Sequence, residues 1–147
     1  MIILAVDYGD VRTGTAICDR LELLASPLGT ITQRNSELLA AELAELAASH
    51  KATEIVMGLP RNMDGSEGFR AAECRAFGQI LSQLSSLPVV FRDERLTTVS
   101  AHGFLNQTDT RGKKRKQIVD TVSAVIILQD HIAARRAKGL GLDAPTA

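Results

Sequence analysis

The start of the chain holds two strand-like segments separated by a gap that is too short for a helix. Residues 2–6 form a dense, partly β-branched apolar run, residues 12–18 alternate threonine with small residues, and Gly9 offers a turn between them. A parallel crossover needs a dozen or more residues, so these two strands have to pair as an antiparallel hairpin.

The hairpin is followed by one more strand and then by alternating helix and strand patterns. We expect a third strand over about residues 22–31 with a kink at Pro27, a helix capped by Asn35 or Ser36 that runs to about Ser49, and a strand at 54–58. We then expect a helix capped by Ser66 that runs to about Leu84, a strand at 88–91, a short helix from Thr97 or Thr98 to about Leu105, and a last helix from about Lys114 to Arg136. This order predicts an α/β fold, with one five-stranded mixed sheet that carries helices on both faces.

The apolar spacing also predicts which side of each helix faces the sheet. The expected inward residues are Leu39, Leu43 and Leu46 in the first helix, and Phe69, Ala72, Ala76, Phe77, Ile80 and Leu84 in the second.

Length and composition limit the kind of protein. A chain of 147 residues is close to one average domain, so we expect a single domain over 1–138 and a frayed tail at 139–147. Cys18 and Cys74 lack metal-ligand spacing and are interpreted as reduced core thiols of an intracellular protein. Because no segment is typical of a signal peptide or a bilayer span, the expected location is the cytoplasm, away from membranes.

The first residue that points to chemistry is Asp7, which closes a buried apolar strand. A buried carboxylate without a partner is costly, so it needs a cation, hydrogen-bond donors or a raised pKa. A purely structural alternative is that Asp7 caps the following turn.

Glu94 stands at the end of another apolar strand that we expect to be buried, where Val89–Phe91 leads directly into charged residues. Ligand sites in open α/β sheets lie outside the carboxyl ends of parallel strands. If the two strands are close together, Asp7 and Glu94 converge. The alternatives are an ion pair of Glu94 with a neighbouring arginine, and Asp93 as the ligand in its place, although adjacent strand residues point to opposite faces.

Asp120 is the third unusual carboxylate. It lies in the last helix on the same side as Ala124 and Ile127, next to the apolar stripe. It is either a solvated boundary residue or a group that faces positive charge.

Together, the three carboxylates suit a hard divalent cation. Magnesium prefers oxygen ligands and keeps several waters, so few protein ligands suffice. Two metal ions about 4 Å apart can serve phosphoryl transfer. A zinc site is disfavoured, because His50, His102 and His131 are scattered and are expected at the surface or its boundary.

A basic stretch, residues 111–116, leads into the helix that bears Asp120. The formal net charge of the whole chain is zero, so any contact with a polyanion would have to be made by a local patch such as this one. The alternative is a solvated loop. Aromatic residues make up 3% of the chain and tryptophan is absent, which favours recognition of backbone or shape over base stacking.

Several short motifs in order resemble the YqgF/RuvX family of pre-16S rRNA nucleases, earlier described as Holliday-junction resolvases. The motifs are Asp7-Tyr8-Gly9 with Arg12-Thr13-Gly14, Gly58-Leu59-Pro60 with Asn62-Met63-Asp64-Gly65, Asp93-Glu94-Arg95-Leu96-Thr97-Thr98, and Val119-Asp120-Thr121 with Ala124-Val125-Ile126-Ile127-Leu128. The resemblance covers roughly Met1 to Arg136.

The resemblance implies an RNase H-like fold and a hydrolase that matures the 5′ end of 16S rRNA in ribosome biogenesis. It implies that Asp7, Glu94 and Asp120 form the catalytic acidic site. The chemistry of these carboxylates points to Mg²⁺ or Mn²⁺ as the ion that they hold, with two ions when substrate is bound. It implies basic positions at Arg12 and Arg95. The basic loop, with Lys113, Lys114, Arg115 and Lys116, is similar in character to that of the family and would contact structured nucleic acid.

Other functions stay open at this stage. RNA is favoured over DNA by the resemblance alone, so a Holliday-junction resolvase is the main alternative, weakened because the fourth strand ends in Gly58-Leu59-Pro60 without an acid. A non-catalytic assembly factor would gain little from clustered acids, and a phosphotransferase of the actin-like type would need two such domains. Exposed sheet edges leave a homodimer open.

Overall fold

The computed structural model describes residues 1–93 and 112–140, with 112–118 described as backbone only. The strands are β1 (Ile3–Asp7), β2 (Arg12–Cys18), β3 (Ala25–Thr32), β4 (Glu54–Leu59) and β5 (Val89–Asp93), and the helices are α1 (Ser36–Ser49), α2 (Phe69–Ser85) and α4 (Gly112–Ala137). The short helix predicted over 97–105 lies outside the described residues. None of the helices within the described ranges combines the length and apolar character that a membrane crossing requires.

The described strands form one mixed sheet in the order β3-β2-β1-β4-β5. β1 pairs with β2, and β2 with β3, in antiparallel fashion, whereas β4 is parallel to both β1 and β5. This confirms the predicted hairpin and the predicted mixed sheet. The carboxyl ends of β1, β4 and β5 therefore meet at one edge of the sheet.

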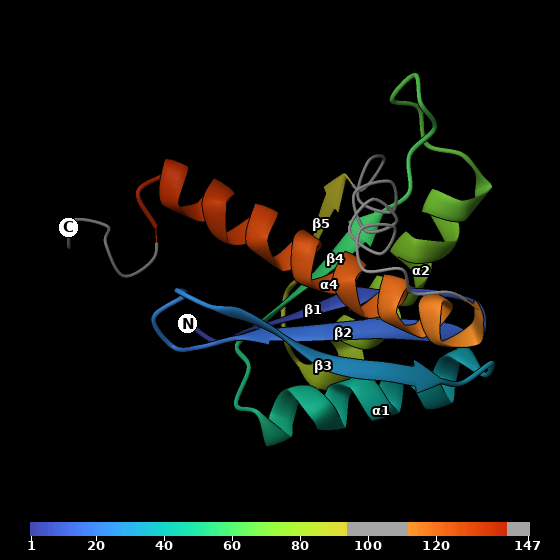
Figure 1. Cartoon of the computed structure of the whole chain (residues 1–147), viewed down its shortest axis with the longest axis horizontal. Coiled ribbons are helices and arrows are strands. Elements are labelled where there is room, and N and C mark those ends of the chain that lie inside the picture. The colour runs from blue at the N-terminus through green and yellow to red at the C-terminus, as the bar shows by residue number, and fades with distance from the viewer. Residues whose placement is uncertain (94–111, 141–147) are drawn as a thin grey trace.

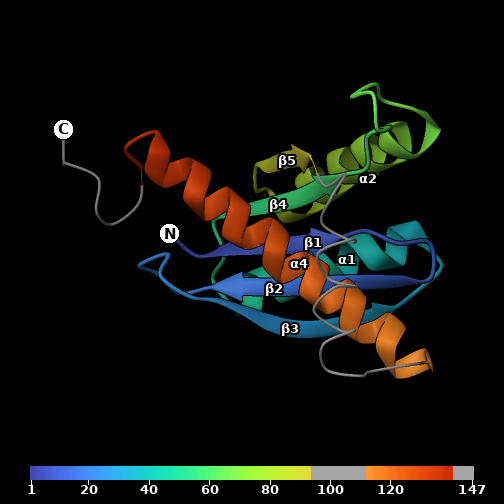
Figure 2. The same ribbon diagram turned by 45° about the horizontal axis from the view of Figure 1, so that its top comes forward.

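Helices cover both faces of the sheet, as predicted (Figure 1). On one face, Leu4 and Val6 of β1 pack against α1 and α2. On the other face, Ile3 and Ala5 pack against α4, which crosses the antiparallel strands diagonally (Figure 2). Because side chains alternate along a strand, this division fixes the face on which each later residue of β1 lies.

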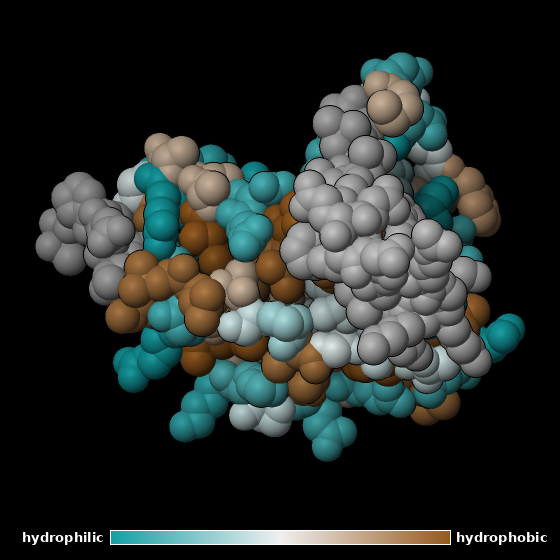
Figure 3. All heavy atoms as spheres, in the orientation of Figure 1, coloured by the Kyte–Doolittle hydropathy of each residue, from teal (hydrophilic) through white to brown (hydrophobic). Residues whose placement is uncertain are grey.

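The β2–β3 connection differs from its prediction. β3 begins at Ala25 rather than near Glu22, because Glu22 has a positive φ of 54° and is buried beneath the turn. The register shifts at Thr15/Ala16, which pair with Gly29 and Pro27, so the extra residue Leu28 forms a bulge beside the predicted kink. With Glu22 turned inward, Leu21, Leu23 and Leu24 are exposed, and apolar side chains gather at this end of the molecule (Figure 3).

Helix α2 differs in its start and in the face that it buries. Gly68 is its N-cap residue, and Ser66 instead hydrogen-bonds within the 62–66 turn, so the predicted Ser66 cap is wrong. Its buried residues are Ala71, Cys74, Phe77, Gly78 and Leu81.

Of the predicted inward residues of α2, Phe77 is buried and Ile80 is partly buried. Phe69 and Leu84 are 82% and 54% exposed, and Ala72 and Ala76 are also exposed. The reason is the close approach at Gly78, where an added Cβ would lie 2.6 Å from Phe91 Cζ of β5. Because Gly78 has no side chain, α2 packs with its small residues against the sheet.

The other predicted core features are largely confirmed. Helix α1 is capped by Asn35, whose side chain accepts a hydrogen bond from the Leu38 amide, and it buries Leu39 and Leu43, with Leu46 partly buried. Cys18 and Cys74 are buried free thiols. β5 is only partly buried, contrary to prediction, because it lies at the edge of the described sheet.

Candidate active site

Asp7 ends β1 on the face of the sheet that α4 covers. Ile3 and Ala5 pack in the cluster with α4, and Asp7 follows them at the same alternation. Its cross-strand partner in β2 is Gly14. Directly opposite residues of an antiparallel pair project on the same face with Cβ positions about 5 Å apart.

Gly14 brings the helix backbone against this pair. A Cβ added at Gly14 would lie 2.0 Å from the carbonyl oxygen of Asp120, so β2 and α4 touch through their backbones. One residue further along α4, Thr121 Oγ1 lies 3.0 Å from Thr30 Oγ1 of β3. Gly14 is therefore flanked by Asp7 across the strand pair and by the Asp120 backbone of α4.

Arg12 completes this group from the start of β2. Its Nε donates a hydrogen bond of 3.0 Å to Asp120 Oδ2, and the two side chains are 35% and 20% exposed. Burial raises the pKa of the Asp120 carboxyl, and Arg12 offsets part of this rise. Asp120 is therefore not a solvated boundary residue, because it faces positive charge.

The turn between β1 and β2 is held tightly in place. A Cβ at Gly9 would lie 2.0 Å from the Arg12 carbonyl oxygen, so only glycine fits there. The Gly9 amide donates to Thr13 Oγ1 at 3.3 Å. The turn therefore fixes the positions of Asp7 before it and of Arg12 after it.

The same turn is contacted by α2, a feature that sequence reasoning missed. The Tyr8 ring stacks on Phe77, with centroids 4.2 Å apart and planes 8° from parallel. Arg70 donates from Nη1 to Asp10 Oδ1 at 2.7 Å and from Nη2 to the Tyr8 carbonyl at 3.0 Å. Burial raises the pKa of the Tyr8 hydroxyl, and Arg70 opposes this rise.

Not every predicted site residue can be placed. Glu94 and Arg95 lie outside the described residues. Lys113, Lys114, Arg115 and Lys116 form the start of α4, where the backbone alone is described. Asp93 follows Phe91 at the same strand alternation, and Phe91 meets α2, whereas Asp7 lies on the face that α4 covers.

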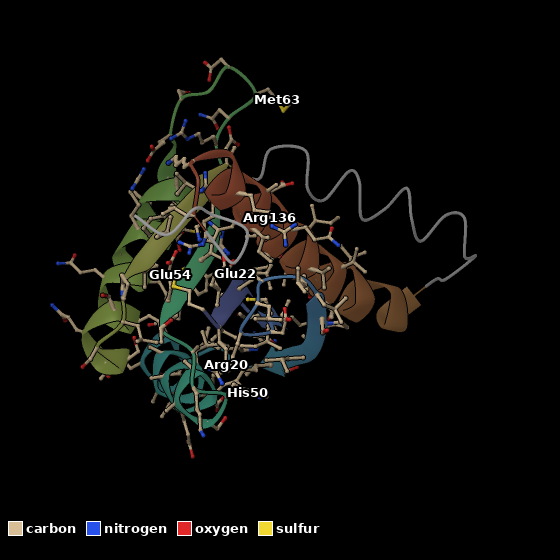
Figure 4. The ribbon with its side chains drawn as sticks, turned by 90° about the vertical axis from the view of Figure 1, so that its left-hand side faces the viewer. Arg20, Glu22, His50, Glu54, Met63 and Arg136 are labelled. Carbon is tan, nitrogen blue, oxygen red and sulfur yellow. The ribbon has the colours of Figure 1, made fainter. Side chains whose placement is uncertain are left out.

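A second polar cluster, which the sequence did not reveal, lies toward the opposite end of the sheet (Figure 4). His131 of α4 is 3% exposed, so the prediction of a surface histidine is wrong. Its Nε2 lies 2.6 Å from Glu54 Oε1, and its Nδ1 accepts a hydrogen bond of 3.0 Å from Arg92 Nε. Because arginine only donates, Nδ1 is unprotonated and His131 donates to Glu54 through Nε2. Burial lowers the pKa of His131, although Glu54 opposes this shift.

The donor set at the Asp7 edge suits a hard cation. In the described ranges, no group of three or more Asp, Glu, His or Cys side chains could hold a metal ion, and the third predicted ligand falls outside them. The residues that are described still fit, because Asp7 is paired with Gly14, Gly14 contacts the backbone of Asp120, and both aspartates supply oxygen ligands at this part of the sheet. Magnesium and manganese need few carboxylates, since water fills the remaining positions.

Comparison with solved structures defines the fold. The chain is similar to Thermus thermophilus RuvC in complex with a Holliday junction substrate, with a TM-score of 0.61 and 12% identity over 97% of this chain and 99% of that one. It is also similar to the fowlpox virus resolvase in complex with Holliday junction DNA, with a TM-score of 0.58, 12% identity, and coverage of 91% and 98%. The sheet topology together with these structural neighbours defines an RNase H-like fold.

Sequence comparison then gives the family. The family described as "RuvX: Holliday junction resolvase" matches residues 1–134, and the chain belongs to it. A protein of Ruegeria sp. (strain TM1040) named "Putative pre-16S rRNA nuclease" is 42% identical over 127 residues, which is 86% of this chain and 81% of that protein. A protein of Streptomyces avermitilis with the same name is 39% identical over 137 residues, or 92% and 88%.

Proposed function

We propose that this protein is a divalent-metal-dependent nuclease that processes structured RNA, with the 5′ end of pre-16S rRNA as its substrate. The observation that supports the proposal is that Gly14, the cross-strand partner of Asp7, lies against the backbone of Asp120. The names of the relatives support the choice of RNA, and an action on pre-rRNA is compatible with the cytoplasm. A homodimer through a sheet edge stays a prediction.

Asp7, Asp120 and Glu94 would hold Mg²⁺ or Mn²⁺, with two ions when substrate is bound. The metal would activate a water molecule and stabilise the leaving oxygen. Asp7 is fixed by the glycine turn that follows it, and Asp120 is oriented by Arg12. The chain itself therefore supplies carboxylates whose positions are set before any substrate arrives.

Basic residues near the acids would position the phosphates. Arg12 is 35% exposed beside Asp120, so its guanidinium can reach a phosphate while remaining near the carboxylate. Lys113, Lys114, Arg115 and Lys116 precede Asp120 by four to seven residues of α4, which corresponds to about 6 to 11 Å along the helix axis. With Arg95, they would contact the nucleic-acid backbone and fix its register on the site.

Cleavage of defined substrates tests the proposal. We expect wild-type protein to cleave RNA that carries the 16S leader in the presence of Mn²⁺, and to lose this activity when EDTA removes the metal. Asp7→Asn and Asp120→Asn should each reduce the rate at least about 100-fold, because each removes a charged ligand. Asp130→Asn, an exposed acid of the same helix, is the matched control and should cleave normally.

A four-way DNA junction tested in parallel separates the main alternative. The family is described as Holliday junction resolvases, which favours this substrate. Faster cleavage of the junction than of the leader RNA would replace the proposed substrate. Full activity of Asp7→Asn would refute the proposed metal site itself.

A further inference from the structure

Arg70 is the second residue of α2, and its side chain contacts the turn that joins β1 to β2 (Tyr8–Val11). Its Nη1 donates to Asp10 Oδ1 at 2.7 Å and its Nη2 to the Tyr8 carbonyl oxygen at 3.0 Å. The guanidinium carbon lies 5.0 Å from the centre of the Tyr8 ring. One side chain therefore makes two hydrogen bonds and a cation–π contact with a single short turn.

The geometry of these contacts is better suited to orientation than to stability. The Asp10 side chain is 77% exposed, and ion pairs in such surroundings contribute little to the free energy of unfolding. The planar guanidinium, in contrast, donates to two acceptors in fixed directions. Loss of Arg70 should therefore loosen the turn without unfolding the protein.

The turn connects Arg70 to the acidic site. Tyr8 stacks on Phe77 of α2. Asp7, one residue earlier, lies on the α4 face of the sheet, opposite Gly14, which contacts the Asp120 backbone. Arg12 follows the turn and bonds to Asp120. The turn is thus held by α2 from one side of the sheet, while the residues that flank it contribute the active-site groups on the other.

We propose that Arg70 is a positioning residue, which holds the β1–β2 turn so that Asp7 and Arg12 keep their places relative to Asp120. This inference rests on the proposed metal-dependent nuclease function. Misplacement of a reacting group by about 1 Å can reduce a rate about 100-fold. Residues that orient metal ligands typically contribute about 10- to 100-fold to metal affinity or activity.

The test compares Arg70→Ala with Arg75→Ala. Arg75 is on the same helix and pairs with Glu67 at 2.7 Å, so its replacement makes the same change in charge away from the turn. For Arg70→Ala we expect kcat to fall about 10- to 100-fold and Mn²⁺ affinity, measured by electron paramagnetic resonance, to fall about 10-fold. We expect KM for leader RNA to change less than threefold, and Arg75→Ala to match wild type in all three quantities.

Two further variants allow the positioning role of Arg70 to be tested if Arg70→Ala folds poorly. Arg70→Lys retains the charge but not the planar pair of donors, so it should show an intermediate kcat at an unchanged melting temperature. Asp10→Ala removes one of the two acceptors, and combining it with Arg70→Ala should cause no further loss, because both changes act on the same contact.

The outcomes separate this inference from the proposed function. Wild-type kcat and Mn²⁺ affinity in folded Arg70→Ala, or equal losses in Arg75→Ala, would overturn the positioning role alone. A fall confined to KM would also overturn it, since that result would indicate direct contact with the substrate. Wild-type protein that neither binds Mn²⁺ nor cleaves any substrate would overturn the proposed function and this inference with it.

Discussion

At the scale of single residues, the candidate active site depends on Gly14 having no side chain. β2 and α4 approach so closely there that an added Cβ would lie 2.0 Å from the Asp120 carbonyl oxygen and 3.0 Å from the Thr121 amide nitrogen. These atoms belong to a helix backbone, which cannot move aside as a flexible side chain can. The same contact that holds α4 against β2 at Asp120 therefore makes this position intolerant of substitution.

We predict that Gly14→Ala lowers the free energy of unfolding by about 3 kcal/mol or more, because the helix has to shift away from the sheet. Urea denaturation measures this loss. Gly68→Ala is the control: its nearest neighbour is the Asn62 side chain at 3.4 Å, and we expect a cost of about 1 kcal/mol or less. A Gly14→Ala protein as stable as wild type would show that β2 and α4 are not in close contact at Gly14.

At the scale of elements, α2 shows how tertiary contact overrides a helical pattern. The sequence predicted Phe69 and Leu84 inside, whereas Ala71, Cys74 and Leu81 are inside instead. The small residues let the helix lie close to β4 and β5, and this orientation also brings Phe77 and Arg70 to the β1–β2 turn. The rotation of one helix therefore affects both the core and the site.

We predict opposite sensitivities for two apolar residues of α2. Leu81→Ala should cost about 2 to 5 kcal/mol, because Leu81 is fully buried. Phe69→Ser should change stability by less than about 0.5 kcal/mol, because its side chain is 82% exposed. Chemical denaturation of both variants checks this, and a large loss for Phe69→Ser would support the orientation that the sequence suggested.

At the scale of the whole molecule, a network of buried charged side chains connects segments that are far apart in the sequence. Glu22, which is 2% exposed, accepts hydrogen bonds from Arg135 Nε at 2.6 Å and from the Met1 amine at 3.0 Å. Arg135 also lies 3.9 Å from Glu54, which binds His131. Burial alone would raise the pKa of Glu22, but Arg135 and the terminal amine more than offset this, and the net pKa is lowered.

This lowered pKa predicts a pH-dependent stability. The stabilisation from Glu22 is present above its ordinary pKa of 4.5 and is lost as the pH falls through the lower value in the folded protein. Glu22→Gln should therefore cost about 3 kcal/mol at pH 7, because Arg135 loses its hydrogen-bonded carboxylate, and progressively less below pH 4.5.

Urea denaturation over this pH range measures the effect of Glu22→Gln. Glu45→Gln, an exposed position of α1, serves as its control and should leave stability nearly unchanged at every pH. If the loss in free energy of unfolding caused by Glu22→Gln stayed constant down to pH 3, the charge of Glu22 would not be the source of the stabilisation.

The sequence by itself determined the order of elements, the antiparallel hairpin and the unusual positions of Asp7 and Asp120. These features depend on local periodicity and on gap lengths, which are properties of neighbouring residues. It also identified Glu94, whose placement stays a prediction.

Only the tertiary structure decided the orientation of α2, the burial of His131 and Glu22, and the reach of Arg70 to the β1–β2 turn. Each depends on partners far away in the chain: Arg12 meets Asp120, and Glu22 meets Arg135. A polar side chain looks the same in the sequence whether it faces water or a buried partner. The fold brings the partner residue close, and this partner sets the position and the electrostatic surroundings of the polar side chain.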